Sequence, residues 1–122
     1  MNHTARFLKV AEAARQRINE TTISAIKERL DRGDPFHLID VREDHEWDGG
    51  RIPGAMHLGR GIIERDIEEN IADIDADIVV YCGGGYRSAM VADQLQKMGY
   101  THVLSMDGGY RDWTEAGHPT VQ

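Results

Sequence analysis

The sequence predicts an α/β fold in which buried strands alternate with helices and are joined by crossover connections. Three apolar, β-branched runs have the length of strands that are covered on both faces, at 36–41, 78–81 and 102–106. The second run is followed by Met90, Val91 and Leu95 at helical spacing. Alternation of this kind favours βαβ units.

The composition fits one small globular domain, because 122 residues can enclose a single core. The net charge of −7 opposes nucleic-acid binding, which depends on Lys and Arg. No apolar run approaches the roughly 18 residues needed to cross a bilayer. The start of the chain lacks the apolar core of a signal peptide, so we expect a cytoplasmic protein without membrane partners; a transit peptide is the alternative. The single cysteine, Cys82, excludes an internal disulfide and a cysteine-based zinc site.

Residues 4–16 are predicted to form an amphipathic helix that precedes the domain. Thr4 can cap this helix, and one apolar face consists of Phe7, Val10, Ala11 and Ala14. Such a helix can pack on the surface of its own domain, or it can dock a partner or a second copy to form a homodimer. We therefore predict an N-terminal helical extension at 1–17 and a domain at 18–122.

The remaining predicted elements alternate as the fold class requires. They are an edge strand from Ile18, a helix capped by Thr21 or Thr22 and ended by Gly33, the strand 36–41, a polar loop with one helical turn at 44–47, a short strand at 55–58, a helix at 59–70, the strand 78–81, a helix from Ser88 to Gly99, the strand 102–106 and a closing helix at 110–116. The helix at 59–70 has an acidic outer face, which we interpret as solvated surface, with a docking patch as the alternative.

A glycine-rich loop joins the strand 78–81 to the helix that follows it. The loop and its flanks consist of Cys82, Gly83, Gly84, Gly85, Tyr86, Arg87 and Ser88. Glycines allow backbone N–H groups to turn inward, the helix presents its positive end, and Arg87 adds a cation. Each of these features favours a thiolate over a thiol. We therefore predict that Cys82 is a reactive nucleophile.

Four motifs in this chain resemble those of rhodanese-type sulfurtransferases. They are Asp40-x-Arg42 at the end of a strand, the segment Gly-Arg-Ile-Pro-Gly-Ala at 50–55, Cys82-x-x-Gly85-x-Arg87-Ser88, and Asp107-Gly108-Gly109 followed by Trp113. Together they cover residues 18–122. The resemblance implies a rhodanese-like fold, with a twisted, mainly parallel β-sheet of about five strands and helices on both faces.

The resemblance also implies a sulfurtransferase that moves sulfane sulfur through a persulfide on Cys82. In such a ping-pong cycle the donor is thiosulfate, mercaptopyruvate or a persulfide, and the acceptor is cyanide or a thiol, including one on a protein. Arg87 and the N–H groups of the loop, from Gly83 to Ser88, would bind the donor anion and stabilise the persulfide. The chemistry needs no metal and no organic cofactor.

Two other functions stay open at this level. The family's phosphatases and arsenate reductases have one more residue in the loop than the four between Cys82 and Arg87, so that chemistry is the lesser alternative. The second alternative is a rhodanese-like interaction module, in which the fold serves to dock a partner and any catalysis is incidental. The N-terminal helix and the acidic face favour this alternative.

Three residues outside the loop are predicted to support it. Asp40 and Arg42 would tie the neighbouring loop to the active-site loop. Tandem-domain sulfurtransferases often carry an arginine where Glu46 stands, and we expect Glu46 to pair with Arg87 and orient it. Positions 83 and 84 lack the basic side chains that suit thiosulfate, so the sequence leaves the donor open.

Overall fold

The computed structural model describes residues 3–122 and contains one five-stranded sheet in which every strand pair is parallel. The strands lie in the order β1 (Asn19–Thr21), β5 (His102–Met106), β4 (Asp77–Tyr81), β2 (His37–Asp40) and β3 (Met56–His57). The predicted α/β class is confirmed. Because β4 occupies the middle of the sheet, the chain leaves the centre of the molecule at Cys82.

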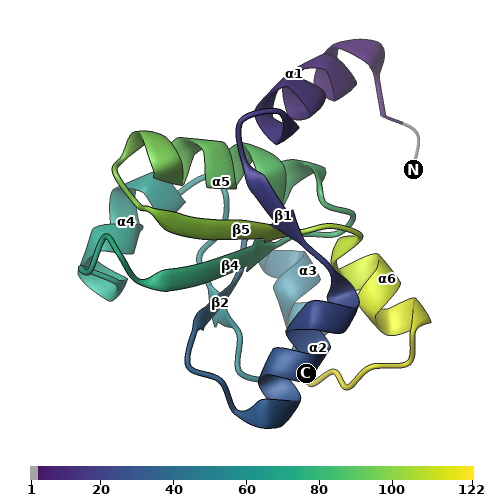
Figure 1. Ribbon diagram of the computed structural model, residues 1–122. Coiled ribbons are helices and arrows are strands. Elements are labelled where there is room, and N and C mark those ends of the chain that lie inside the picture. The colour runs from purple at the N-terminus through teal and green to yellow at the C-terminus, as the bar shows by residue number, and fades with distance from the viewer. Residues whose placement is uncertain (1–2) are drawn as a thin grey trace.

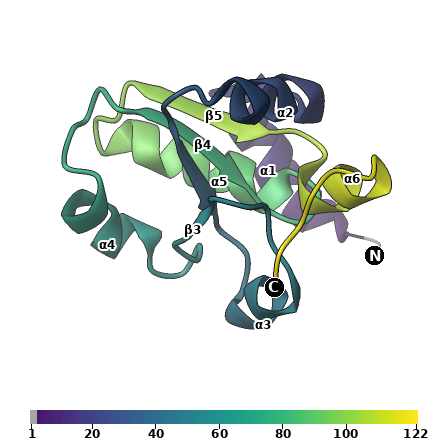
Figure 2. The same ribbon diagram turned by 90° about the horizontal axis from the view of Figure 1, so that it is seen from below.

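Within residues 3–122, six helices surround this sheet. They are α1 (Ala5–Arg15), α2 (Ile23–Arg32), α3 (Asp44–Gly49), α4 (Ile63–Asn70), α5 (Tyr86–Lys97) and α6 (Gly109–Glu115). Figures 1 and 2 show α4 and α5 on one side of the sheet and α2 and α6 on the other. The C-terminus runs beside α3, where Val121 forms an antiparallel bridge with Arg51.

The core has two layers because successive side chains of a strand point to opposite faces. On β4, Ile78 and Val80 pack with the apolar residues of α4 and α5, whereas Val79 and Tyr81 pack with those of α2 and α6. All four side chains are fully buried. Burial on both faces explains why this strand reads as an uninterrupted apolar run.

Two helices begin two or more residues away from the predicted position. The helix expected from residue 59 begins at Ile63, because Gly59 and Gly61 lie in a turn closed by the Ile62 N–H and the Gly59 carbonyl. The helix expected from Ser88 begins at Tyr86 instead. Its N-cap is Gly85, whose φ of 112° lies in the left-handed region that glycine accepts most readily.

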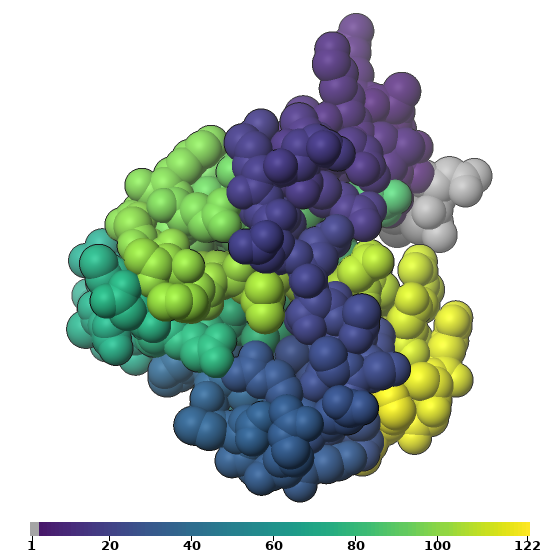
Figure 3. Space-filling view, viewed as in Figure 1, coloured from purple at the N-terminus to yellow at the C-terminus, as the bar shows by residue number. Residues whose placement is uncertain are grey.

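The N-terminal helix α1 packs along α5 and stands out from the body of the molecule (Figures 1 and 3). Its side chains Ala11 and Ala14 are buried against Met90 of α5, and Arg17 forms a 2.8 Å ion pair with Asp93. Of the two arrangements that the sequence leaves open, the structure shows the one in which the helix packs on its own domain. Dimerisation through α1 and the division at residue 17 stay predictions, and residues 1–2 of the extension lie outside the described residues.

Within residues 3–122, no helix combines the length and the apolar character that a bilayer-spanning segment needs.

The packing of α1 predicts different effects for two neighbouring substitutions. Ala11→Asp places a carboxylate in the contact with α5, and we expect it to lower the free energy of unfolding by about 1–3 kcal/mol. Val10→Asp is the matched control, because Val10 is 59% exposed, and its effect should stay within about 0.5 kcal/mol. Urea denaturation and hydrogen exchange of the α1 amides measure both. Equal effects of the two variants would show that α1 does not dock through Ala11.

Candidate active site

The thiol of Cys82 lies at the base of the loop that follows β4. Its side chain is only 1% exposed. The Sγ atom accepts a hydrogen bond from the Gly85 N–H at 3.1 Å and lies 3.5 Å from Ser88 Oγ. Ser88 Oγ in turn lies 2.8 Å from Oγ of the fully buried Ser105 on β5. The thiol is therefore the first member of a buried polar chain.

Ser105 is a site residue that the sequence analysis missed. A signal for it exists, because it is the one hydroxyl residue of β5 and pairs in register with Val80, two residues before Cys82. A polar side chain at the carboxyl end of a strand beside the nucleophile's strand points to the same edge of a parallel sheet. Reading the register together with the composition of β5 would have placed Ser105 near the thiol.

The loop is fixed from outside by the first turn of α6. The Tyr110 N–H donates to the Cys82 carbonyl at 2.8 Å, and the Arg111 N–H donates to the Gly83 carbonyl at 2.9 Å. Each of these carbonyls shares a planar, trans peptide unit with the next N–H group, which points the opposite way. The N–H groups of Gly83 and Gly84 are therefore turned away from α6.

The start of α5 offers further N–H groups. Tyr86, Arg87 and Ser88 occupy the first turn, where no intrahelical acceptor exists, and none of their N–H groups donates to a carbonyl within residues 3–122. The helix is 12 residues long, so its dipole adds a positive potential at this end. The loop and the helix start together can bind an anion next to Cys82 Sγ.

Arg87 forms a two-pronged ion pair with Glu46 of α3. Its Nη1 and Nη2 atoms donate to the two carboxylate oxygens at 2.6 and 3.0 Å. The hydrogen bond from Arg87 lowers the pKa of Glu46 to about 2, even though partial burial opposes the shift. The expected pairing is thus present in the structure, and its role in orienting Arg87 during a reaction stays a prediction. The pair lies against Gly83, where a Cβ atom would come within 2.9 Å of Arg87 Nη2.

Asp40 and Arg42 form a buried ion pair at the end of β2. The Arg42 guanidinium donates to both carboxylate oxygens of Asp40 at 2.8 to 3.1 Å and to the Gly50 carbonyl at 2.6 Å. It also lies 4.1 Å from the ring centroid of Tyr110, whose N–H group holds the Cys82 carbonyl. The pair therefore reaches the active-site loop indirectly, through α6.

The side chain of Tyr86 faces the N-terminal helix. Its ring meets Phe7 edge to face at a centroid distance of 6.1 Å, and Arg15 lies 5.9 Å from the same ring. Sequence reasoning placed Tyr86 among the substrate-binding residues. The ring thus packs against α1, and a role for Tyr86 in binding substrate stays a prediction.

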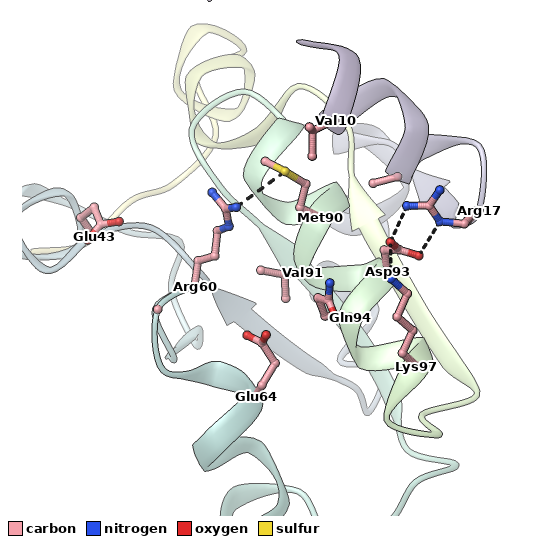
Figure 4. A pocket seen from close by; sticks show the side chains of 12 residues that line it. Val10, Arg17, Glu43, Arg60, Glu64, Met90, Val91, Asp93, Gln94 and Lys97 are labelled. Carbon is pink, nitrogen blue, oxygen red and sulfur yellow. Dashed lines mark hydrogen bonds and ion pairs between the residues drawn. The ribbon is translucent and has the colours of Figure 1, made fainter. Parts of the chain in front are cut away.

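A separate groove of about 660 Å³ lies beside this site, between α1, α5 and the segment before α4 (Figure 4). Arg60 crosses it to contact the Met90 sulfur at 3.7 Å, and Arg17 and Asp93 close one end. Cys82 does not line this groove.

Within residues 3–122, no group of three or more His, Cys, Asp or Glu side chains is arranged so that it could hold a metal ion.

Comparison with known proteins identifies the family. Residues 22–116 match the family model of the rhodanese-like domain. The chain belongs to the rhodanese-like domain family. A sulfurtransferase of Allochromatium vinosum is 33% identical over 104 residues, which cover 85% of this chain and 95% of that protein. YrkF of Bacillus subtilis, provisionally named a sulfur carrier protein, is 33% identical over 97 residues, which cover 80% of this chain and only 51% of YrkF.

The fold neighbours agree with this assignment. A structure from Rhodopseudomonas palustris, described as a protein of unknown function and possible tyrosine phosphatase, superimposes with a TM-score of 0.80 at 28% identity. The alignment covers 98% of both chains and therefore includes the α1 region that precedes the family match. The predicted membership of the rhodanese-like family is confirmed.

The Glu46–Arg87 pair predicts a defined pH dependence of stability. The folded-state pKa of Glu46, about 2, lies below its ordinary value of 4.5, so the carboxylate stabilises the fold above pH 4.5. This contribution is lost as the pH falls from 4.5 toward 2. Glu46→Gln should lower the free energy of unfolding by about 1–2 kcal/mol at pH 7, and the difference from the unmodified protein should shrink over that interval.

Urea denaturation at a series of pH values measures this difference. Glu69→Gln is the control, because Glu69 is an exposed carboxylate on α4, and its difference from the unmodified protein should be small at every pH. A Glu46→Gln difference that stays constant from pH 7 to pH 2 would contradict the account.

The contact between α6 and the loop predicts that Gly109 cannot be replaced. Its φ is 58°, and a Cβ atom there would lie 2.5 Å from the Cys82 carbonyl oxygen and 2.7 Å from the Gly83 carbonyl carbon. Gly109→Ala should therefore cost at least about 2 kcal/mol of stability. Gly33→Ala shares a left-handed φ of 71° but meets open space, so it should cost about 1 kcal/mol. A calorimetric comparison in which both variants lose equally would refute the close approach.

Proposed function

We propose that this chain is a sulfurtransferase that carries sulfane sulfur as a persulfide on Cys82. Membership of the rhodanese-like family and a relative named as a sulfurtransferase support sulfur transfer. One observation supports the finer claim most directly: Cys82 Sγ accepts the Gly85 N–H at 3.1 Å, at the start of a helix whose first three N–H groups donate to no carbonyl within residues 3–122. Such an arrangement stabilises negative charge on sulfur.

In the first half-reaction the thiolate of Cys82 attacks the outer sulfur of the donor. A sulfur–sulfur bond forms on Cys82, and the donor's bond to that sulfur breaks. The electron pair of that bond leaves with sulfite when the donor is thiosulfate, or with a thiolate when it is a persulfide; mercaptopyruvate would release pyruvate. The free N–H groups of the loop would bind the departing anion. Ser88 would hydrogen bond to the sulfur from the core side, and Ser105 would hold the Ser88 hydroxyl in place.

In the second half-reaction an acceptor removes the outer sulfur. A thiolate acceptor attacks it, forms a new persulfide and returns Cys82 as a thiolate; cyanide would leave as thiocyanate. The loop needs no metal or organic cofactor for either step. The acceptor is a small molecule or a thiol of another protein, and the location of the reaction in the cytoplasm and a dimeric state remain our predictions.

The loop argues against phosphatase chemistry as the main activity. Only four residues separate Cys82 from Arg87, and Glu46 engages both Nη atoms of that arginine. A tetrahedral phosphoryl group needs a wider loop and a free guanidinium to bind its oxygens. A pure interaction module is also less well supported than sulfur transfer, because it has no use for a thiol held against free N–H groups.

Intact mass spectrometry tests the proposal. The protein is treated in turn with thiosulfate, mercaptopyruvate and glutathione persulfide, with Cys82→Ser as the control. We expect a gain of one sulfur atom from at least one donor, absent in the variant and removed by cyanide. The donor that loads most completely identifies the preferred substrate. No gain from any donor, in a protein shown to be folded by circular dichroism, would refute the persulfide mechanism.

A further inference from the structure

The guanidinium of Arg111 lies against the active-site loop at Gly84. Its Nη1, Cζ and Nη2 atoms are 3.5, 3.8 and 3.9 Å from the position that a Cβ atom on Gly84 would occupy. Because the distance to the central carbon lies between the distances to the two nitrogens, the flat group faces Gly84 rather than pointing one end at it. The absence of a side chain at residue 84 leaves this cation at the rim of the loop that begins with Cys82.

Two contacts hold Arg111 in this place. Its backbone N–H donates to the Gly83 carbonyl at 2.9 Å, and its Nε donates to the carboxylate of Asp112 at 3.1 Å. The side chain is 64% exposed, and neither Nη atom donates to an acceptor within residues 3–122. Both Nη groups are therefore accessible from solvent and have hydrogen-bonding capacity left for a ligand.

The other guanidinium groups near the loop are already occupied. Both Nη atoms of Arg87 bind Glu46. Arg42 is 4% exposed and binds Asp40 and a carbonyl. Arg111 binds its carboxylate through Nε alone, so its paired Nη groups form the open fork that suits an oxyanion. Of the three, Arg111 is the most exposed, at 64% against 26% for Arg87, and it is the one whose Nη atoms have no acceptor within residues 3–122.

We propose that Arg111 binds the anionic end of the sulfur donor and so selects donors that carry a sulfonate or a carboxylate. This inference rests on the proposed function of Cys82. With thiosulfate, the Cys82 thiolate bonds to the outer sulfur, the bond between the two donor sulfurs breaks, and sulfite leaves with that electron pair. The sulfite oxygens lie beside the Nη groups of Arg111 during this step. This transfer of sulfur needs no added oxidant or reductant.

The placement of Arg111 also accounts for two features of the sequence. Glu46 places a carboxylate on Arg87, and Gly83 and Gly84 carry no charged side chain. In this chain α6 supplies the cation that those positions lack. The same contact with Gly84 explains how a loop of three glycines can still recognise a charged donor.

Alkylation of Cys82 tests the inference without requiring sulfur transfer. Iodoacetate and iodoacetamide attack the same sulfur, but only iodoacetate carries a negative charge. Arg111→Gln should lower the ratio of the iodoacetate rate to the iodoacetamide rate by about three- to fivefold. The control is Arg65→Gln, because Arg65 also binds the next residue, here Asp66, on an exposed helix surface, through Nε and Nη2, and lies on α4. The control should leave the ratio unchanged.

A second variant returns a positive charge to this place by adding a lysine on the loop itself. Gly84 does not have a left-handed φ, and a side chain there meets Arg111 only at ordinary contact distances. Gly84→Lys in the Arg111→Gln background should therefore recover part of the lost iodoacetate preference. In the sulfurtransferase assay, Arg111→Gln should raise the KM for thiosulfate by a similar factor and change kcat little.

The outcomes separate the two proposals. An unchanged rate ratio in Arg111→Gln would overturn the role of Arg111, even in a protein that forms the persulfide. An equal slowing of both reagents would also overturn it, because it would mean that the loop itself was disturbed. A changed ratio in a protein that never accepts sulfur would support the anion site at Arg111 and refute the proposed function alone.

Discussion

Two backbone hydrogen bonds, from the N–H groups of Tyr110 and Arg111 to the carbonyls of Cys82 and Gly83, determine how the active-site loop is presented. They turn those carbonyls outward and, through peptide planarity, the following N–H groups away from α6. The close approach is sterically possible only because residue 109 is glycine. The anion site beside the thiol is therefore a consequence of tertiary packing as much as of the glycine-rich sequence.

The charges around the loop are arranged so that the side chains closest to it are largely neutralised. Arg87 is balanced by Glu46, and Arg42 by Asp40. What remains to attract an anion is the set of N–H groups at the start of α5, together with the open fork of Arg111. Backbone groups need little reorganisation when charge moves from Cys82 to a leaving group, because they are already fixed in position.

Much of this fold could be predicted from the sequence. The apolar run before Cys82 and the glycines after it placed the thiol at the end of a central strand, since this pattern has few other structural solutions. The pairing of Glu46 with Arg87 could be expected because an acidic residue near the loop needs a partner. The strand and the glycines are local patterns that depend on neighbours in the chain, whereas the pairing of Glu46 with Arg87, 41 residues away, is expected from the family resemblance.

The remaining features depend on contacts between distant segments. Arg111 and Ser105 belong to elements that meet the loop only after the sheet has assembled, so residue type alone does not identify either of them. Ser105 becomes recognisable once the register of β5 with β4 is added. The ring of Tyr86 faces α1 because the N-terminal helix packs along α5, which the sequence offered only as one of two arrangements. The first residue of α5 was misplaced because Gly85 serves as its N-cap.

The most direct test of the account is a high-resolution crystal structure of the protein after treatment with thiosulfate. We expect additional density for one sulfur atom bonded to Cys82 Sγ, within hydrogen-bonding distance of the N–H groups at the start of α5. Clear density for an unmodified Cys82 in crystals of protein that mass spectrometry shows to be loaded would contradict the account, because the sulfur would then be carried elsewhere.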